Sequence, residues 1–156
     1  SEIAPNLFMG GTADEDVIHQ AAPYNKARTD LPFDAIITMY AWANPADWRV
    51  QEFRYGIYDS AIADIDLDRL KQAVEFGYNR WLSGDRVLVR CQAGLNRSGL
   101  VTALIMMSTG LDAETAIEQI RKNRADIALF NNNYVEWLMS EGAQFLAPST
   151  YEEISR

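Results

Sequence analysis

The feature that most constrains this sequence is a short apolar run followed at once by a loop that holds its only cysteine. Residues 87–99 read VLVRCQAGLNRSG. The run Val87–Val89 is typical of a buried strand, and the apolar stretch over about residues 98–108 indicates a helix. The segment therefore predicts a strand, a tight loop and a helix, with Cys91 at the end of the strand, facing the first turn of the helix.

This loop is predicted to bind an anion. The backbone N–H groups from Gln92 to Arg97 can curl into a cup of donors, to which the helix dipole adds positive potential. Arg97 would place its planar guanidinium across the cup, and Gly94 permits a turn where a side chain would crowd the anion. The same field favours the thiolate form of Cys91, to which Ser98 can donate. A tetrahedral oxyanion fits such a site.

Strand-like and helix-like stretches alternate along the rest of the chain. Further strands are predicted at Leu7–Met9, Ala35–Met39 and 53–57. Helices are predicted over about residues 14–21 and 66–82, after the cap Asp112, and after the turn at residues 131–133. This order implies one α/β domain over residues 1–156, with a central, mostly parallel sheet of about four to five strands flanked by helices.

The composition limits the chemistry and the partners. One cysteine among 156 residues rules out an intrachain disulfide and a thiolate-rich metal site. A single free thiol is typical of a reducing compartment, so a cytoplasmic location is expected. The net charge of −8 disfavours nucleic acids and anionic lipid surfaces. Neither a membrane span of ~18 apolar residues nor a secretory signal near Ser1 is expected, and a monomer is expected.

The loop Cys91–Ser98 has the pattern C-x5-R-[ST], and with it the chain resembles the cysteine-dependent protein phosphatases. It is most similar to the small dual-specificity (protein tyrosine) phosphatases. Flanking segments that resemble the same family lie at residues 3–11, 33–37, 55–59, 120–124 and 131–138, so the resemblance covers about residues 3–145. It implies the phosphatase fold and a hydrolase that needs no metal or cofactor.

The resemblance also implies a role for each loop residue. Cys91 would be the nucleophile that forms a cysteinyl-phosphate, and Ser98 would stabilise the departing thiolate. The side chain of Arg97 would hold the equatorial oxygens of the phosphoryl group. The backbone amides that would hold them with it belong to Gln92, Ala93, Gly94, Leu95, Asn96 and Arg97.

A neighbouring carboxylic acid should protonate the leaving group. Asp59 is the first candidate, because it follows a predicted strand whose carboxyl end faces the same crevice as the cysteine loop. Asp64 is the second candidate. Asp59 can also be read as an ordinary turn residue, and Asp64 as one of several acids near a helix N-terminus.

Four further residues have two interpretations each. The resemblance places Arg124 near the pocket rim, where it would bind a second phosphate or the substrate backbone; it is otherwise a partner of the helix dipole. Asn131 matches a family asparagine that braces the site, or is a helix cap. Trp42 and Trp48 are expected at the same end of the sheet as the site, where they either form the floor of a groove for an aromatic phosphoresidue or serve in core packing or a rim contact.

The nature of the substrate is less constrained. Arg90 stands where the family usually has histidine, which leaves open a phosphoresidue-binding protein with weak catalysis. The neutral residues of the loop favour a phosphorylated protein or peptide over a phosphoinositide or an RNA 5′-triphosphate, which stay as alternatives. The prediction is a phosphatase acting on phosphotyrosine, with phosphoserine and phosphothreonine as further substrates.

Overall fold

The structure is a computed structural model in which residues 1–12 and 31–148 are described. The helix predicted over residues 14–21 lies outside the described residues. The other predicted segments can be compared with the structure directly.

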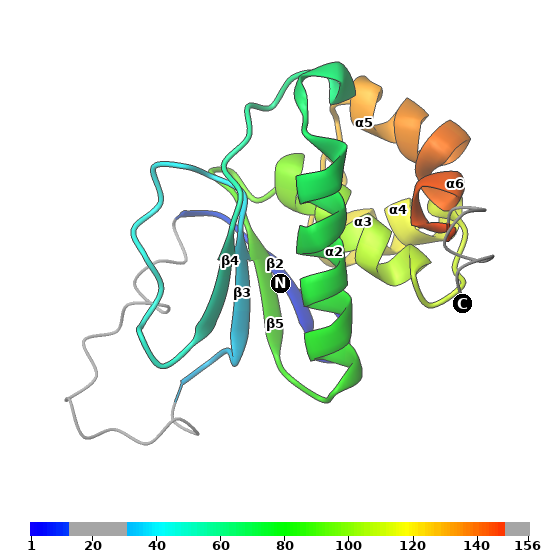
Figure 1. Cartoon of the computed structure of the whole chain (residues 1–156). Coiled ribbons are helices and arrows are strands. Elements are labelled where there is room, and N and C mark those ends of the chain that lie inside the picture. The colour runs from blue at the N-terminus through cyan, green and yellow to red at the C-terminus, as the bar shows by residue number, and fades with distance from the viewer. Residues whose placement is uncertain (13–30, 149–156) are drawn as a thin grey trace.

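A five-stranded sheet forms one layer of the molecule (Figure 1). Its strands are β1 (Glu2–Ala4), β2 (Leu7–Gly10), β3 (Ala35–Thr38), β4 (Gln51–Arg54) and β5 (Val87–Arg90), in the order β1-β2-β5-β3-β4. β1 runs antiparallel to β2, and every other pair is parallel. The prediction of a mostly parallel sheet is confirmed. The carboxyl ends of β2, β3, β4 and β5 therefore meet at one edge.

The strand predicted over residues 53–57 ends earlier than expected, at Arg54. The chain still follows β3, because Tyr55 N–H donates to Thr38 O over 2.9 Å and Ile57 N–H to Met39 O over 3.3 Å. At Gly56 it passes so close to the neighbouring loop that a Cβ would lie 2.5 Å from Ala41 Cβ. This close approach replaces the ladder by an irregular extended segment, which carries the chain to Asp59.

The helices lie on one side of the sheet in Figure 1. α2 (Leu67–Leu82) and α4 (Ala113–Asn123) begin at caps, because the carboxylates of Asp66 and Asp112 accept backbone N–H groups of the first turn. α3 (Arg97–Met107) is buried along its whole length. α5 (Asn132–Trp137) and α6 (Ala143–Leu146) are joined by the π-helical turn Leu138–Gly142, and a 3-10 turn spans Ile62–Asp64.

The two faces of the sheet bury different sets of side chains. Along β5, Val87 and Val89 belong to the main core under the helices, together with Cys91. Leu88 belongs to a smaller cluster on the other face, with Ile36. Because strand side chains alternate, Arg90 points to the face of Leu88, away from the cysteine.

Candidate active site

The cysteine loop, Cys91–Ser98, connects the carboxyl end of β5 to the first turn of α3. Gly94 has a φ of +71°, and a Cβ there would lie 2.5 Å from the carbonyl carbon of Gly10. A side chain at position 94 would thus be strained and would also collide with the end of β2. The loop therefore packs directly against the carboxyl edge of the sheet.

Cys91 is 1% exposed and its sulfur is held by the loop itself. The Gly94 N–H donates to Sγ over 3.3 Å, and Ser98 Oγ lies 3.3 Å from Sγ. The Gly94 N–H and, by rotation of its hydroxyl, Ser98 can each donate a hydrogen bond to the sulfur. The sulfur can be reached only by a group that enters the loop.

Within the described part of the chain, the cysteine loop carries hydrogen-bond donors that have no protein acceptor. Arg97 is 9% exposed; its Nη1 donates to Ile57 O over 2.9 Å, whereas its buried Nε has no hydrogen-bond partner among the residues that the structure describes. Within residues 1–12 and 31–148, no protein acceptor is bonded to the backbone N–H groups of Gln92, Ala93, Leu95, Asn96 and Arg97. Unpaired donors at a helix N-terminus form an anion-binding site.

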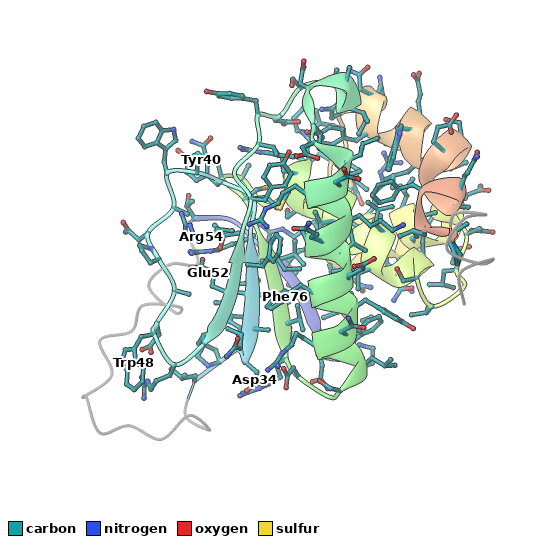
Figure 2. The ribbon with its side chains drawn as sticks, in the orientation of Figure 1. Asp34, Tyr40, Trp48, Glu52, Arg54 and Phe76 are labelled. Atoms are coloured by element: carbon teal, nitrogen blue, oxygen red, sulfur yellow. The ribbon has the colours of Figure 1, made fainter. Side chains whose placement is uncertain are left out.

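A pocket of about 460 Å³ lies beside the loop. It is lined by Tyr40, Ala41, Trp42, Gly56, Ile57, Tyr58, Asp59, Gln92 and Arg97. Trp42 and Tyr58, which we call the pocket mouth, are 83% and 85% exposed. Core packing was one of the two interpretations of Trp42, and it is wrong. Trp48 is 81% exposed and lies at the opposite end of the sheet from Tyr40 (Figure 2), so core packing and the expectation that it lies beside the site are both wrong.

Asp59 lines the pocket, and both of its carboxylate oxygens accept from side-chain amides. Asn96 Nδ2 donates to Oδ2 over 2.7 Å, and Asn131 Nδ2 donates to Oδ1 over 2.8 Å. The Asn131 backbone N–H donates in turn to Asn96 Oδ1 over 2.9 Å. These bonds tie the carboxylate to the cysteine loop. Asp64 instead accepts from Ser60 Oγ over 3.1 Å, so of the two candidate carboxyl groups it is Asp59 that lines the pocket.

The side chain of Asn96 is a site residue that the sequence analysis missed, since only its backbone was considered. Asn131 serves in both of the ways considered for it. Its Nδ2 braces the loops through Asp59 and Ser60 O, and its Oδ1 accepts from Asn133 N–H as the cap of α5. The available signal for Asn96 was that it is one of two side-chain amides in the loop, the other being Gln92.

Arg124 is placed behind the cysteine loop. It caps the carboxyl end of α4, and its guanidinium donates to Gly94 O over 3.0 Å, to Ala93 O over 3.4 Å and to Ser1 Oγ over 3.2 Å. The structure thus uses this side chain to hold loop carbonyls in place. Direct contact between Arg124 and a substrate stays a prediction.

Tyr134 holds the backbone of Tyr58 at the pocket mouth. Its side chain is fully buried and its hydroxyl donates to Tyr58 O over 3.1 Å. Burial, together with the nearby charge of Asp59, raises the pKa of Tyr134 to about 12. The phenol therefore stays protonated and keeps its hydrogen bond at neutral pH.

A mostly parallel sheet with a cysteine–arginine loop at its carboxyl edge is the arrangement of the cysteine-dependent phosphatases. The family model "Dual specificity phosphatase, catalytic domain" matches residues 20–144, and the chain belongs to this family. The resemblance stated from the sequence is thereby confirmed.

Two curated relatives come from Xenopus laevis. The chain is 29% identical to dual specificity protein phosphatase 1-A and 28% identical to dual specificity protein phosphatase 1-B. Each alignment spans 97% of this chain but 39% of the relative, so the chain spans about two fifths of the length of these relatives.

Solved structures show the same fold. The human tyrosine phosphatase-like serine/threonine/tyrosine-interacting protein superposes with a TM-score of 0.72 at 21% identity, covering 94% of this chain and 97% of its own. DUSP15 superposes with a TM-score of 0.69 at 20% identity, covering 94% and 91%. None of the described helices is long and apolar enough to cross a membrane.

Proposed function

We propose that this chain is a metal-independent phosphoprotein phosphatase that hydrolyses phosphotyrosine, and phosphoserine and phosphothreonine as well, through a cysteinyl-phosphate. One observation carries the proposal: a buried sulfur lies inside a loop in which the amides of residues 92, 93 and 95–97 and Arg97 Nε have no protein acceptor in the described chain. Membership of the dual specificity phosphatase family supports it. A phosphoryl group is the tetrahedral anion that would use all of these donors.

In the first step, Cys91 Sγ attacks phosphorus. The S–P bond forms as the bond to the leaving oxygen breaks, and the Asp59 carboxylic acid gives its proton to that oxygen. The loop amides and the Arg97 guanidinium bind the three equatorial oxygens, whose charge shifts in the transition state. The products are a free phenol or alcohol and the phosphorylated cysteine.

In the second step, water attacks the cysteinyl-phosphate. The Asp59 carboxylate takes a proton from the water as the S–P bond breaks, and inorganic phosphate leaves. The thiolate returns to its contacts with Gly94 N–H and Ser98 Oγ, which stabilise it as a leaving group. Asn96 and Asn131 hold the Asp59 carboxyl group in place throughout.

The shape of the pocket supports a phosphorylated protein or peptide as the substrate. The lining is mostly aromatic and small, with Arg97 as its one basic side chain among the described lining residues. An aromatic mouth suits the ring of a phosphotyrosine and its apolar neighbours. A ligand with several phosphates would need further cations at this point. A cytoplasmic location is also proposed, and it rests on the single free thiol alone.

The experiment is hydrolysis of p-nitrophenyl phosphate between about pH 5 and pH 8, with Cys91→Ser as the control. We expect turnover by the parent and none by the control, followed by release of phosphate from a phosphotyrosine peptide. A parent that binds the phosphopeptide but never turns it over would replace this proposal by a phosphoresidue-binding role.

A further inference from the structure

A buried charged cluster lies behind the pocket, on the sheet face opposite to the cysteine. Its centre is Arg90, the last residue of β5, which is 0% exposed. Arg90 Nε donates to Thr38 Oγ1 over 3.0 Å, and Nη2 donates to Glu52 Oε2 over 3.2 Å. Nη2 also donates to the carbonyl of Asn44 over 2.6 Å. One guanidinium therefore connects three segments of the chain.

Glu52, the acidic partner of Arg90, also forms hydrogen bonds to several segments of the chain. Glu52 Oε1 accepts from the backbone N–H of Ala46 over 3.2 Å, while Oε2 accepts from Thr38 Oγ1 and Arg54 Nη1. Arg54 Nη2 then donates to the carbonyl of Ala43 over 2.7 Å. Arg90, Glu52 and Arg54 thus hold the backbone of residues 43–46 by charge-assisted hydrogen bonds, the stronger kind.

The segment held in this way is also a wall of the pocket. We call residues 40–46 the wall loop. Tyr40, Ala41 and Trp42 line the pocket, and the Arg97 guanidinium lies 5.4 Å from the centre of the Tyr40 ring. Figure 2 shows Glu52 and Arg54 on β4 below Tyr40. The charged cluster therefore supports the wall loop from one side, and the substrate would meet it from the other.

We propose that the Arg90–Glu52 ion pair positions the wall loop and thereby sets how tightly the pocket binds the organic part of a phosphorylated substrate. Arg90 and Glu52 are positioning residues in this scheme, since neither lines the pocket formed by the described chain. The phosphate-binding donors stand on the cysteine loop, which has its own supports in Gly94 and Arg124. The inference rests on the proposed function only in assuming that an aryl phosphate occupies this pocket.

The Glu52 carboxyl group stays ionised under the conditions of the assay. Burial by itself opposes the charge of Glu52, but hydrogen bonds from Thr38, Ala46 and Arg90 and the charge of Arg54 outweigh it, so the pKa of Glu52 lies below its ordinary value. The carboxylate therefore keeps its partners above pH 5, and neutral pH does not switch the wall loop.

Two variants test the proposal. Arg90→Met combined with Glu52→Leu replaces the two charges of the pair by apolar groups of similar volume, so that neither is left buried without the other. Arg54 loses its contact with Glu52 but is 34% exposed and keeps its hydrogen bond to Ala43 O. Arg90→Lys keeps the charge but loses the fork that reaches Thr38, Glu52 and Asn44 together. Folding of each variant is checked by its melting temperature and circular dichroism spectrum.

A matched control exists at the far end of the same sheet. Arg86 donates to both carboxylate oxygens of Asp34, each over 3.1 Å, and Asp34 lies away from Tyr40 in Figure 2. Arg86→Met combined with Asp34→Leu removes this second ion pair without touching the wall loop, although the pair is more exposed than Arg90–Glu52. Any loss of stability common to both pairs is thereby separated from an effect on the pocket.

The readouts are kcat and KM for an aryl phosphate, the inhibition constant of inorganic phosphate, and the dissociation constant of a phosphotyrosine peptide in the Cys91→Ser background. In the Arg90/Glu52 variants we expect KM and the peptide dissociation constant to rise about tenfold, with kcat within about twofold of the parent. Inhibition by inorganic phosphate, which contacts only the cysteine loop, should not change. The control pair should leave all four values unchanged.

Unchanged KM and peptide binding in a folded Arg90/Glu52 variant would overturn the inference, as would an equal loss of inhibition by inorganic phosphate. Peptide binding by Cys91→Ser separates this inference from the proposed function. A parent that binds the peptide without turnover refutes the phosphatase proposal, while the binding readout still decides the role of the pair. A Cys91→Ser chain that binds no phosphotyrosine peptide overturns the inference as well.

Discussion

The cysteine loop and the pocket mouth are neighbours in space but differ in how they are held. Cys91, Asn96 and Ser98 are buried, and their side chains or neighbouring amides are fixed by hydrogen bonds. Trp42 and Tyr58 project into solvent from irregular segments. Preorganised groups act on charge at no cost of reorganisation, whereas exposed aromatic side chains adapt to a partner. In the proposed function, the cysteine loop therefore carries out the chemistry and the pocket mouth selects the substrate.

Cys91→Ser is the substitution with the largest expected effect, and it tests whether the cysteine loop carries the chemistry. An oxygen in place of the sulfur is a poor nucleophile and a poor leaving group, so kcat for p-nitrophenyl phosphate should fall on the order of 10⁵-fold. Phosphopeptide binding should remain measurable by calorimetry. Retention of more than a small fraction of the activity would remove the cysteine from the chemistry.

Arg97→Lys tests whether the geometry of the loop matters beyond its charge. Lysine keeps one positive charge but cannot donate to Ile57 O and to two phosphate oxygens at once. We expect kcat to fall by about 10²–10³-fold, with a smaller effect on KM. Steady-state kinetics measures both values, and an equal rate would show that charge alone is sufficient.

Asp59→Asn addresses the acid, with Asp64→Asn as its matched control. Without a proton donor, kcat for a substrate with a poor leaving group, such as phenyl phosphate, should drop by about 10²-fold or more. The drop should be smaller with p-nitrophenyl phosphate, whose leaving group needs less protonation. If Asp64→Asn shows the larger loss, the acid is Asp64 and the bonds from Asn96 and Asn131 have another purpose.

Trp42→Ala tests the mouth. Because the indole is exposed, the melting temperature should change little, with an effect within about 0.5 kcal/mol on the free energy of unfolding. The KM of a phosphopeptide should rise severalfold, while hydrolysis of p-nitrophenyl phosphate keeps its kcat. A kcat that falls as steeply as in Asp59→Asn would contradict the division between loop and mouth.

Tyr134→Phe gives the smallest expected effect and concerns the buried support of Tyr58. At neutral pH the lost hydrogen bond should cost about 1 kcal/mol of the free energy of unfolding. The pKa of Tyr134 is about 12 in the folded protein against an ordinary value of 10.0, so above pH 10 only the unfolded phenol ionises. The parent therefore loses stability from pH 10 to 12, whereas the variant lacks this loss. Urea unfolding should show the stability difference between parent and variant narrowing and then changing sign over this range, because a loss over about two pH units exceeds the ~1 kcal/mol of the hydrogen bond. A constant difference would contradict the assignment.

The local sequence pattern was sufficient to predict the strand before the cysteine and the starts of the helices. The β-branched run before Cys91, the aspartates at positions 66 and 112 and the asparagine at 131 each act within a few residues of their own position. The strand, the start of the helix near Asp66, the caps Asp112 and Asn131 and the position of the cysteine loop after the strand therefore followed from the sequence. The family pattern extended this to the loop chemistry, because the donors belong to consecutive residues.

Contacts between distant segments could not be read in this way. Nothing in the local sequence states that Asn96 meets Asp59, that Arg124 reaches the back of the loop, or that Trp48 lies at the other end of the sheet. The early end of β4 likewise depends on the approach of Gly56 to Ala41. The sequence alone determined which groups could bind and attack a phosphoryl group, since these lie on one short loop. The tertiary structure decided which distant side chains hold that loop and shape its pocket, since packing alone brings those segments together.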